Sequence, residues 1–159
     1  MRLKFIKPED FVNYRKCSMF LGTCFCDWKC CHEANVPESV CHNREWGGNP
    51  IKTISDESII SHYLEDGLTE AVVIGGLEPM LQFDELLGFV KAFREKTQDD
   101  IVVYTGYYPD EIPDKVAALS EYPNIVIKFG RYVPNKPSRY DDVLGVTLAS
   151  DNQFAKRIL

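Results

Sequence analysis

Residues 71–76 read Ala-Val-Val-Ile-Gly-Gly, and this stretch decides the fold class. A short continuous apolar run that ends in two glycines is typical of a strand buried on both faces. Similar short runs occur at residues 17–21, 101–104 and 125–127. We therefore predict that these four segments are strands of one sheet, and we expect a last strand within residues 143–148.

Helical patterns fill the intervals between the predicted strands. Ser55 is a predicted N-cap, and apolar residues then recur on one helix face until Gly67, a predicted stop. Residues 83–93 also carry apolar side chains at helical spacing, and residues 110–122 predict a third helix. This alternation of strand and helix indicates right-handed βαβ units and a mainly parallel sheet.

The length of the chain limits how far such a sheet can extend. The chain has 159 residues, and a full eight-unit barrel needs at least ~200. Hydrophobic residues make up 45% and charged residues 26%, which is an ordinary globular composition. We therefore predict an α/β fold, a partial, open βα barrel that forms a single domain over residues 1–159.

Charge and hydropathy narrow the range of partners. The net charge is −6, and an acidic surface repels phosphate backbones, so we expect no nucleic-acid partner. No apolar run approaches the ~20 residues that a membrane span needs. The first ten residues lack the apolar region of a signal peptide. The expected location is the cytoplasm, without a membrane partner.

Cysteine usage is the unusual feature of this sequence. All six cysteines lie between Cys17 and Cys41, and five of them fall in a predicted long loop over residues 22–50. A disulfide-stapled domain would spread its cysteines along the chain, whereas a tight group indicates metal binding. Thiolates select zinc, copper(I) or iron–sulfur clusters. No Cys-x-x-Cys pair of a zinc site is present, although His32 and His42 keep a Cys/His zinc site open.

A second candidate feature follows the strand at residues 71–74. Residues 75–79 read Gly-Gly-Leu-Glu-Pro. Glycines let a ligand approach the backbone closely, and a glutamate at such a turn is able to accept a hydrogen bond from a ligand amine. A simple strand-to-helix turn is the alternative reading. Because ligands bind beyond the carboxyl ends of parallel strands, we expect the loops after Leu21, Ile74 and Tyr104 to share one edge.

Taken in order, these motifs resemble those of radical S-adenosylmethionine enzymes, and in particular the activating proteins of anaerobic ribonucleotide reductase. The resemblance rests on the Cys26-x-x-x-Cys30 pair, on Cys41 followed by His-Asn, and on the Gly-Gly-x-Glu-Pro turn. Three further stretches support it, namely Thr-Gly-Tyr at residues 105–107, Gly-Arg-Tyr at 130–132 and Ser-Asp-Asn-Gln at 150–153.

The sequence departs from the family pattern at two places. The third cysteine of the family follows the second after two residues, whereas here the inserted residues 31–40 delay it to Cys41. Leu77 also lengthens the turn that is usually Gly-Gly-Glu or Gly-Gly-Asp. We expect the inserted residues to form a partner-docking excursion.

The resemblance implies a specific site and reaction. It makes Cys26, Cys30 and Cys41 the ligands of a 4Fe-4S cluster that keeps one iron open for S-adenosylmethionine, with no catalytic residue beyond the cluster. The reaction would place a radical on a glycine of a large glycyl radical enzyme, with an anaerobic ribonucleotide reductase as the expected partner. A low-potential donor such as a flavodoxin or a ferredoxin would supply the electron. The implied contacts to S-adenosylmethionine come from Gly75, Gly76, Glu78, Thr105 and Asn152.

Other functions remain open at this point. One is a zinc-binding interaction module with a structural cysteine loop. Another is a thiol redox protein that uses the vicinal pair Cys30-Cys31 or the pair Cys24-x-Cys26. A nearer alternative keeps the cluster and S-adenosylmethionine but acts on a different substrate.

Overall fold

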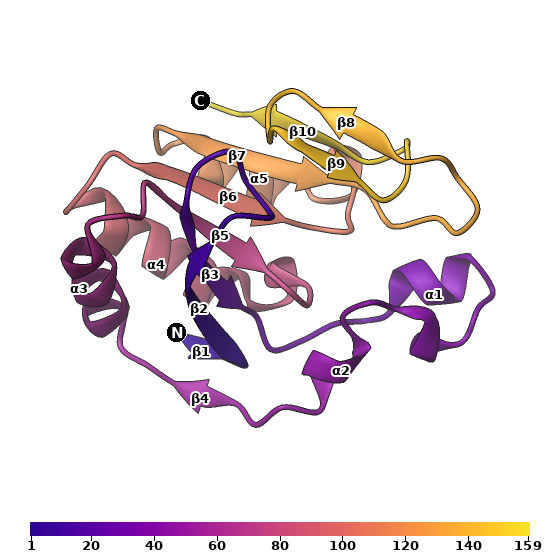
Figure 1. The fold of residues 1–159 in the computed structure, drawn as a ribbon, viewed down its shortest axis with the longest axis horizontal. Helices are drawn as coiled ribbons and strands as arrows, with labels where there is room; N and C mark the ends of the chain where they lie inside the picture. Colours follow the sequence, from indigo (N-terminus) through magenta and orange to yellow (C-terminus); the bar gives the residue numbers. More distant parts are fainter.

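The computed structural model describes residues 1–159 and shows an open sheet with helices packed on one of its faces (Figure 1). The sheet has six strands in the spatial order β10-β7-β6-β5-β3-β2. Two small ribbons, β1 with β4 and β8 with β9, lie outside it. The strands of the main sheet are β2 (Phe5–Asp10), β3 (Ser18–Gly22), β5 (Ala71–Gly75), β6 (Asp100–Tyr104), β7 (Ile125–Phe129) and β10 (Phe154–Arg157).

The four predicted central strands are confirmed, and β3, β5, β6 and β7 pair in parallel. The two outer strands, β2 and β10, pair antiparallel and were not expected. Strand β2 reads Phe-Ile-Lys-Pro-Glu-Asp and lies at the edge, where proline and charge are tolerated. An edge strand therefore lacks the apolar run on which the prediction depended.

The strand expected within residues 143–148 exists only in part and belongs elsewhere. Strand β9 (Val146–Leu148) pairs with β8 (Arg139–Asp141) in a separate hairpin rather than extending the main sheet. The other small ribbon joins β1 (Arg2–Leu3) to β4 (Lys52–Thr53).

The three expected helices are α3 (Asp56–Asp66), α4 (Phe83–Arg94) and α5 (Pro113–Leu119). The predicted cap of α3 is confirmed, because the Ser55 side chain accepts a hydrogen bond from the Ser58 N–H at 3.2 Å. Its predicted stop is also confirmed, because Gly67 has a φ of +71°, a conformation that favours glycine. Short 3-10 turns, η2 (Pro79–Gln82) and η3 (Pro109–Glu111), precede α4 and α5.

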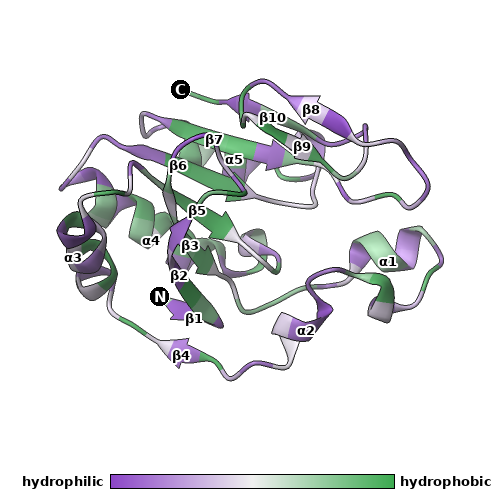
Figure 2. Cartoon of the chain, viewed as in Figure 1, coloured by the Kyte–Doolittle hydropathy of each residue, from purple (hydrophilic) through white to green (hydrophobic).

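The continuous apolar runs of the central strands are explained by two covered faces. In β5, Val72 and Ile74 belong to the large core beneath α3, α4 and α5. Ala71 and Val73 belong to a smaller core on the other face, which is covered by the β2–β3 loop and the β8–β9 hairpin. Both faces of a central parallel strand are therefore buried, and Figure 2 shows these strands as apolar.

Residues 22–50 cross the carboxyl ends of the strands, and Figure 1 shows them projecting beyond the sheet. The predicted long loop holds three short turns of helix, α1 (Lys29–Glu33), η1 (Glu38–Val40) and α2 (Arg44–Gly47). The sheet does not close on itself, so a partial barrel remains a prediction. None of the helices is both long enough and apolar enough to cross a membrane.

Candidate metal centre

The register of the sheet brings the candidate motifs to one edge. Gly22 at the end of β3 lies opposite Gly75 at the end of β5, and Ile74 pairs with Val103 near the end of β6. The Thr23 N–H donates to the Gly75 carbonyl at 2.8 Å. The loops after β3, β5 and β6 therefore share the carboxyl edge, as expected for a ligand site in a parallel sheet.

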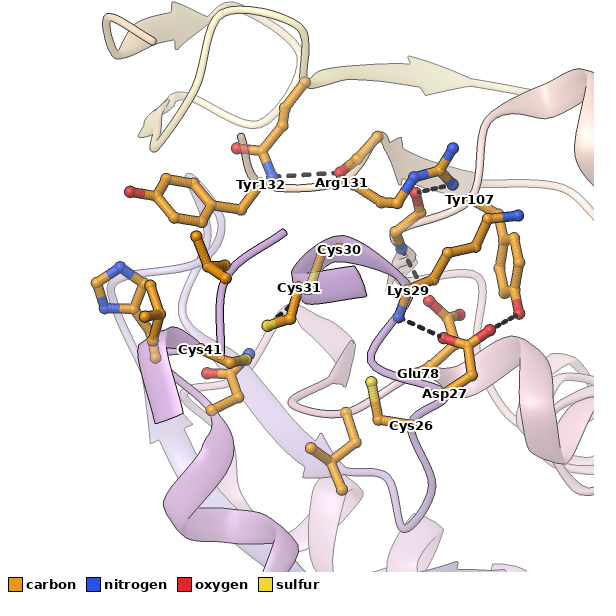
Figure 3. Close-up of a pocket in the computed structure, with 18 of the residues that line it drawn as sticks. Cys26, Asp27, Lys29, Cys30, Cys31, Cys41, Glu78, Tyr107, Arg131 and Tyr132 are labelled. Carbon is orange, nitrogen blue, oxygen red and sulfur yellow. Dashed lines mark hydrogen bonds between the residues drawn. The ribbon is translucent and has the colours of Figure 1, made fainter. Parts of the chain in front are cut away.

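A cavity of about 170 Å³ lies at this edge, between the cysteine segment and the strand ends (Figure 3). The three predicted ligands, Cys26, Cys30 and Cys41, all line it, and so does Cys31. The other two cysteines, Cys17 and Cys24, do not. The fold thus brings together thiols that are up to fifteen residues apart in the sequence.

The thiols of this cavity influence one another. Burial raises the pKa of Cys26 to about 11, although the Trp28 N–H donates to its sulfur at 3.4 Å. The neighbouring Cys41 thiol lowers the pKa of Cys30, and the Cys30 thiol raises the pKa of Cys41. The sulfur of Cys31 lies 3.8 Å from that of Cys30.

The donors that line the cavity are thiols, which are suited to an iron–sulfur cluster. No three His, Cys, Asp or Glu side chains are placed so that they converge on one ion. A four-iron cluster binds each thiolate through a different iron, so its ligands surround a body instead of meeting at a point. His42 packs edge-on against Tyr132 at 5.5 Å, and His32 lies beside Glu38 on the surface.

The Gly-Gly-x-Glu-Pro turn forms one wall of the cavity through Gly76 and Glu78. Gly76 has a φ of +88°, which permits the turn at little steric cost. The Glu78 carboxylate is buried and accepts hydrogen bonds from the Thr105 hydroxyl at 2.8 Å, the Gly106 N–H at 2.8 Å and the Met80 N–H at 3.0 Å. Burial raises the pKa of Glu78, and these three hydrogen bonds oppose the rise.

The remaining predicted contact residues do not line the cavity. Gly75 faces β6, and a Cβ added to it would lie 3.0 Å from the Cβ of Tyr104. Thr105 acts on Glu78 through its hydroxyl. Asn152 donates to the Tyr108 hydroxyl and to the Arg131 carbonyl, but its own Oδ1 is buried without a partner. A buried acceptor of this kind is rare in proteins.

The sequence reading missed Lys128, a charged residue beneath the site. Lys128 lies in β7 and is buried, and its ammonium donates to the Gly130 carbonyl at 2.8 Å without a carboxylate partner. Burial lowers its pKa to about 8, and the nearby Glu78 carboxylate opposes this change. The only signal in the sequence is a lysine inside an apolar strand.

The sequence reading also missed the polar residues that hold the cysteine segment. The Tyr107 hydroxyl donates to the Asp27 carboxylate at 2.6 Å, and Arg131 forms ion pairs with Glu33 and Glu111. In the sequence, Arg131 belongs only to the short Gly-Arg-Tyr stretch. No local pattern identifies its partners, because Glu33 is 98 residues away along the chain.

A comparison with protein families agrees with the donor set. A family model described as a 4Fe-4S single cluster domain matches residues 14–153, which include the four thiols of the cavity and the Gly-Gly turn. No curated protein and no solved structure matches the chain. The match covers most of the chain, so the chain belongs to the 4Fe-4S single cluster domain family.

Proposed function

We propose that this protein is a radical S-adenosylmethionine activase, which cleaves S-adenosylmethionine reductively at its 4Fe-4S cluster and generates a glycyl radical on a partner enzyme. The observation that carries the proposal is the shared cavity. The thiols of Cys26, Cys30 and Cys41 and the buried carboxylate of Glu78 line the same space. An electron-transfer domain has no need of a buried carboxylate opposite its cluster.

Three of the four thiols are suited to hold the cluster. Cys26, Cys30 and Cys41 are each partly exposed, whereas Cys31 is only 3% exposed. Ligation by three thiolates leaves one metal position free for a reactant, as in catalytic metal sites. When bound, the cluster would supply that position and the electron that splits the sulfonium.

The chain's own residues would orient the bound S-adenosylmethionine. Glu78 is held in place by three donors, and its carboxylate still lines the cavity, where it is able to accept from an ammonium group. Gly76 has a φ of +88°, which lets the backbone turn here and form part of the cavity wall. The unpartnered Oδ1 of Asn152 is one further acceptor close to this edge.

The proposed target is a large glycyl radical enzyme, with an anaerobic ribonucleotide reductase as the expected partner. The chain has 159 residues and uses most of them for the sheet and the cysteine segment, so little is left to build a deep pocket for a separate substrate. A flavodoxin or a ferredoxin is the expected electron donor.

The test is electron paramagnetic resonance on anaerobically reconstituted, reduced protein, with and without S-adenosylmethionine. We expect a signal from a reduced four-iron cluster that changes when S-adenosylmethionine is added. The matched variant Glu78→Gln should keep the cluster signal but need more S-adenosylmethionine to change it. A cluster signal that ignores S-adenosylmethionine at all concentrations would refute the proposal.

A second candidate function is electron transfer by a cluster with four thiolate ligands. It is favoured by one observation, the presence of Cys31 in the same cavity with its sulfur 3.8 Å from that of Cys30. Four thiolates would leave no iron open. This candidate predicts a cluster signal that S-adenosylmethionine does not change.

A further inference from the structure

One arginine ties the cysteine segment to the sheet. The Arg131 side chain is 10% exposed, and its Nε donates to the Glu33 carboxylate at 2.6 Å. Its two terminal nitrogens donate to both oxygens of Glu111, at 2.6 and 3.2 Å. A guanidinium is suited to this task, because its rigid fork of donors matches two carboxylates at once.

The same network reaches both ends of helix α1. Glu111 also accepts a hydrogen bond from Lys29 at 2.8 Å, so the first residue of α1, Lys29, and the last, Glu33, are both connected to Arg131. Cys30 and Cys31 lie between Lys29 and Glu33 in this helix.

Helix α1 depends on such contacts for its position. It has five residues, and its N-cap, Trp28, has a left-handed backbone and forms no side-chain cap. A helix this short is not stable by itself in water. Tertiary contacts must therefore decide where the Cys30 thiol lies.

Arg131 itself is held firmly by the strand ends. Its Nη1 donates to the Gly106 carbonyl at 3.1 Å, and its backbone carbonyl accepts from Asn152 at 2.7 Å. The guanidinium also lies over the Tyr108 ring, 4.7 Å from its centre. A fixed guanidinium loses little conformational entropy when it binds the two carboxylates.

We propose that Arg131 is a positioning residue of the metal centre, which fixes helix α1 through Glu33 and Glu111 and thereby sets the position of the Cys30 thiol. This inference rests on the proposed role of Cys30 as a cluster ligand. It does not depend on S-adenosylmethionine.

The test measures the alkylation rate of each cysteine in the reduced, cluster-free protein by mass spectrometry. We expect Glu33→Gln and Arg131→Gln to raise the rate at Cys30 about three-fold or more, while the rate at Cys17, outside the cavity, stays unchanged. Glu85→Gln, which removes the ion pair with Arg2 away from the cavity, is the matched control and should change neither rate. High salt should raise the Cys30 rate in the wild type more than in Arg131→Gln, because salt screens the ion pairs.

Two further measurements separate positioning from general stability. The urea midpoint of Glu33→Gln should match that of the wild type, since Glu33 is half exposed. After reconstitution, a chelator should remove iron faster from Glu33→Gln than from Glu85→Gln. Equal Cys30 rates in the wild type and Glu33→Gln would overturn the inference, even if Arg131→Gln fails to fold. Because no S-adenosylmethionine is used, failure of the proposed activity would leave this result unaffected.

Discussion

The two consecutive parts of the cysteine segment are held in different ways. Residues 27–33 are tied to distant parts of the chain, through Asp27 to Tyr107 and through α1 to Glu111 and Arg131. Residues 34–41 form hydrogen bonds and ion pairs only within residues 28–44, such as the Cys41 N–H with the Glu38 carbonyl at 3.0 Å. The segment is tied to the body again beyond Cys41, where the Trp46 ring packs on Phe5.

This difference indicates a division of roles within the proposed cluster site. Cys26 and Cys30 lie in or beside the anchored part, so the sheet sets their positions before any cluster is present. Cys41 lies between an unanchored stretch and His42, whose ring packs against Tyr132. Residues 31–40, which we predict to be an insertion, therefore span both parts, because Glu33 belongs to the anchored part and residues 34–40 to the unanchored one. A role of this insertion in docking a partner stays a prediction.

The largest expected effect is the loss of the cluster. Cys26→Ser, Cys30→Ser and Cys41→Ser should each retain less than about a tenth of the wild-type iron and sulfide after anaerobic reconstitution, because hydroxyl groups are poor ligands for soft iron–sulfur clusters. Cys31→Ser and Cys17→Ser are the controls and should retain the full amount. If Cys31→Ser loses the cluster as Cys30→Ser does, four thiolates hold it.

The second effect concerns the lysine beneath the anchored part. Folding lowers the pKa of Lys128 from 10.5 to about 8, so the unfolded chain binds more protons between these values and the Lys128 contribution to stability rises with pH there. Below pH 8, burial of this charge costs up to about 3 kcal/mol. Lys128→Met should therefore raise the free energy of unfolding at pH 7 by a few kcal/mol.

Urea unfolding of the reduced, cluster-free protein checks this effect at two pH values. The advantage of Lys128→Met over the wild type should shrink when the pH is raised from 7 to 9.5, because the wild-type lysine is then neutral in the folded state. An advantage that does not change with pH would show that packing, and not charge burial, is responsible.

A third, smaller effect tests how the segment is anchored beyond Cys41. The Trp46 ring lies 4.9 Å from that of Phe5 and 6.5 Å from that of Phe20. Removing these aromatic contacts by Trp46→Ala should lower the free energy of unfolding by about 1 kcal/mol and raise the alkylation rate of Cys41. Trp46→Phe keeps an aromatic ring, so its free energy of unfolding and its Cys41 alkylation rate should lie between those of Trp46→Ala and the wild type. An unchanged alkylation rate of Cys41 in Trp46→Ala would mean that the contacts of Trp46 do not restrain the Cys41 thiol.

The smallest effect is expected in the unanchored stretch. Inserting Gly-Ser after the exposed Asn35 should change the free energy of unfolding by less than about 0.5 kcal/mol, because lengthening a surface loop costs little. The same insertion after Asp27 is the matched control and should raise the alkylation rate of Cys30, because it displaces α1 from Arg131. Equal effects of the two insertions on Cys30 would contradict the proposed difference between the two parts.

Much of the scaffold was predictable because its signals are local. The apolar runs of β5, β6 and β7 reflect burial on both faces of the sheet. The Ser55 cap and the Gly67 stop depend only on residues next to the ends of α3. The edge strands were not predictable in this way. Strand β10, for example, reads Phe-Ala-Lys-Arg and obtains its conformation from pairing with β7.

For the candidate site, the sequence alone determined which chemistry is available. Six clustered cysteines and a Gly-Gly-x-Glu-Pro turn at the end of a buried strand are enough to predict a thiolate metal site at the carboxyl edge of a parallel sheet. Ligand type and strand direction depend on residue identity and local pattern, so both can be predicted without coordinates.

Only the tertiary structure decided which of these groups meet. It placed Cys31 in the cavity and Cys24 outside it, directed Thr105 to Glu78, and brought Arg131 to helix α1. The physical reason is that ion pairs and buried hydrogen bonds join residues far apart in the chain. Their geometry follows from the packing of the whole sheet, so no short stretch of sequence predicts it.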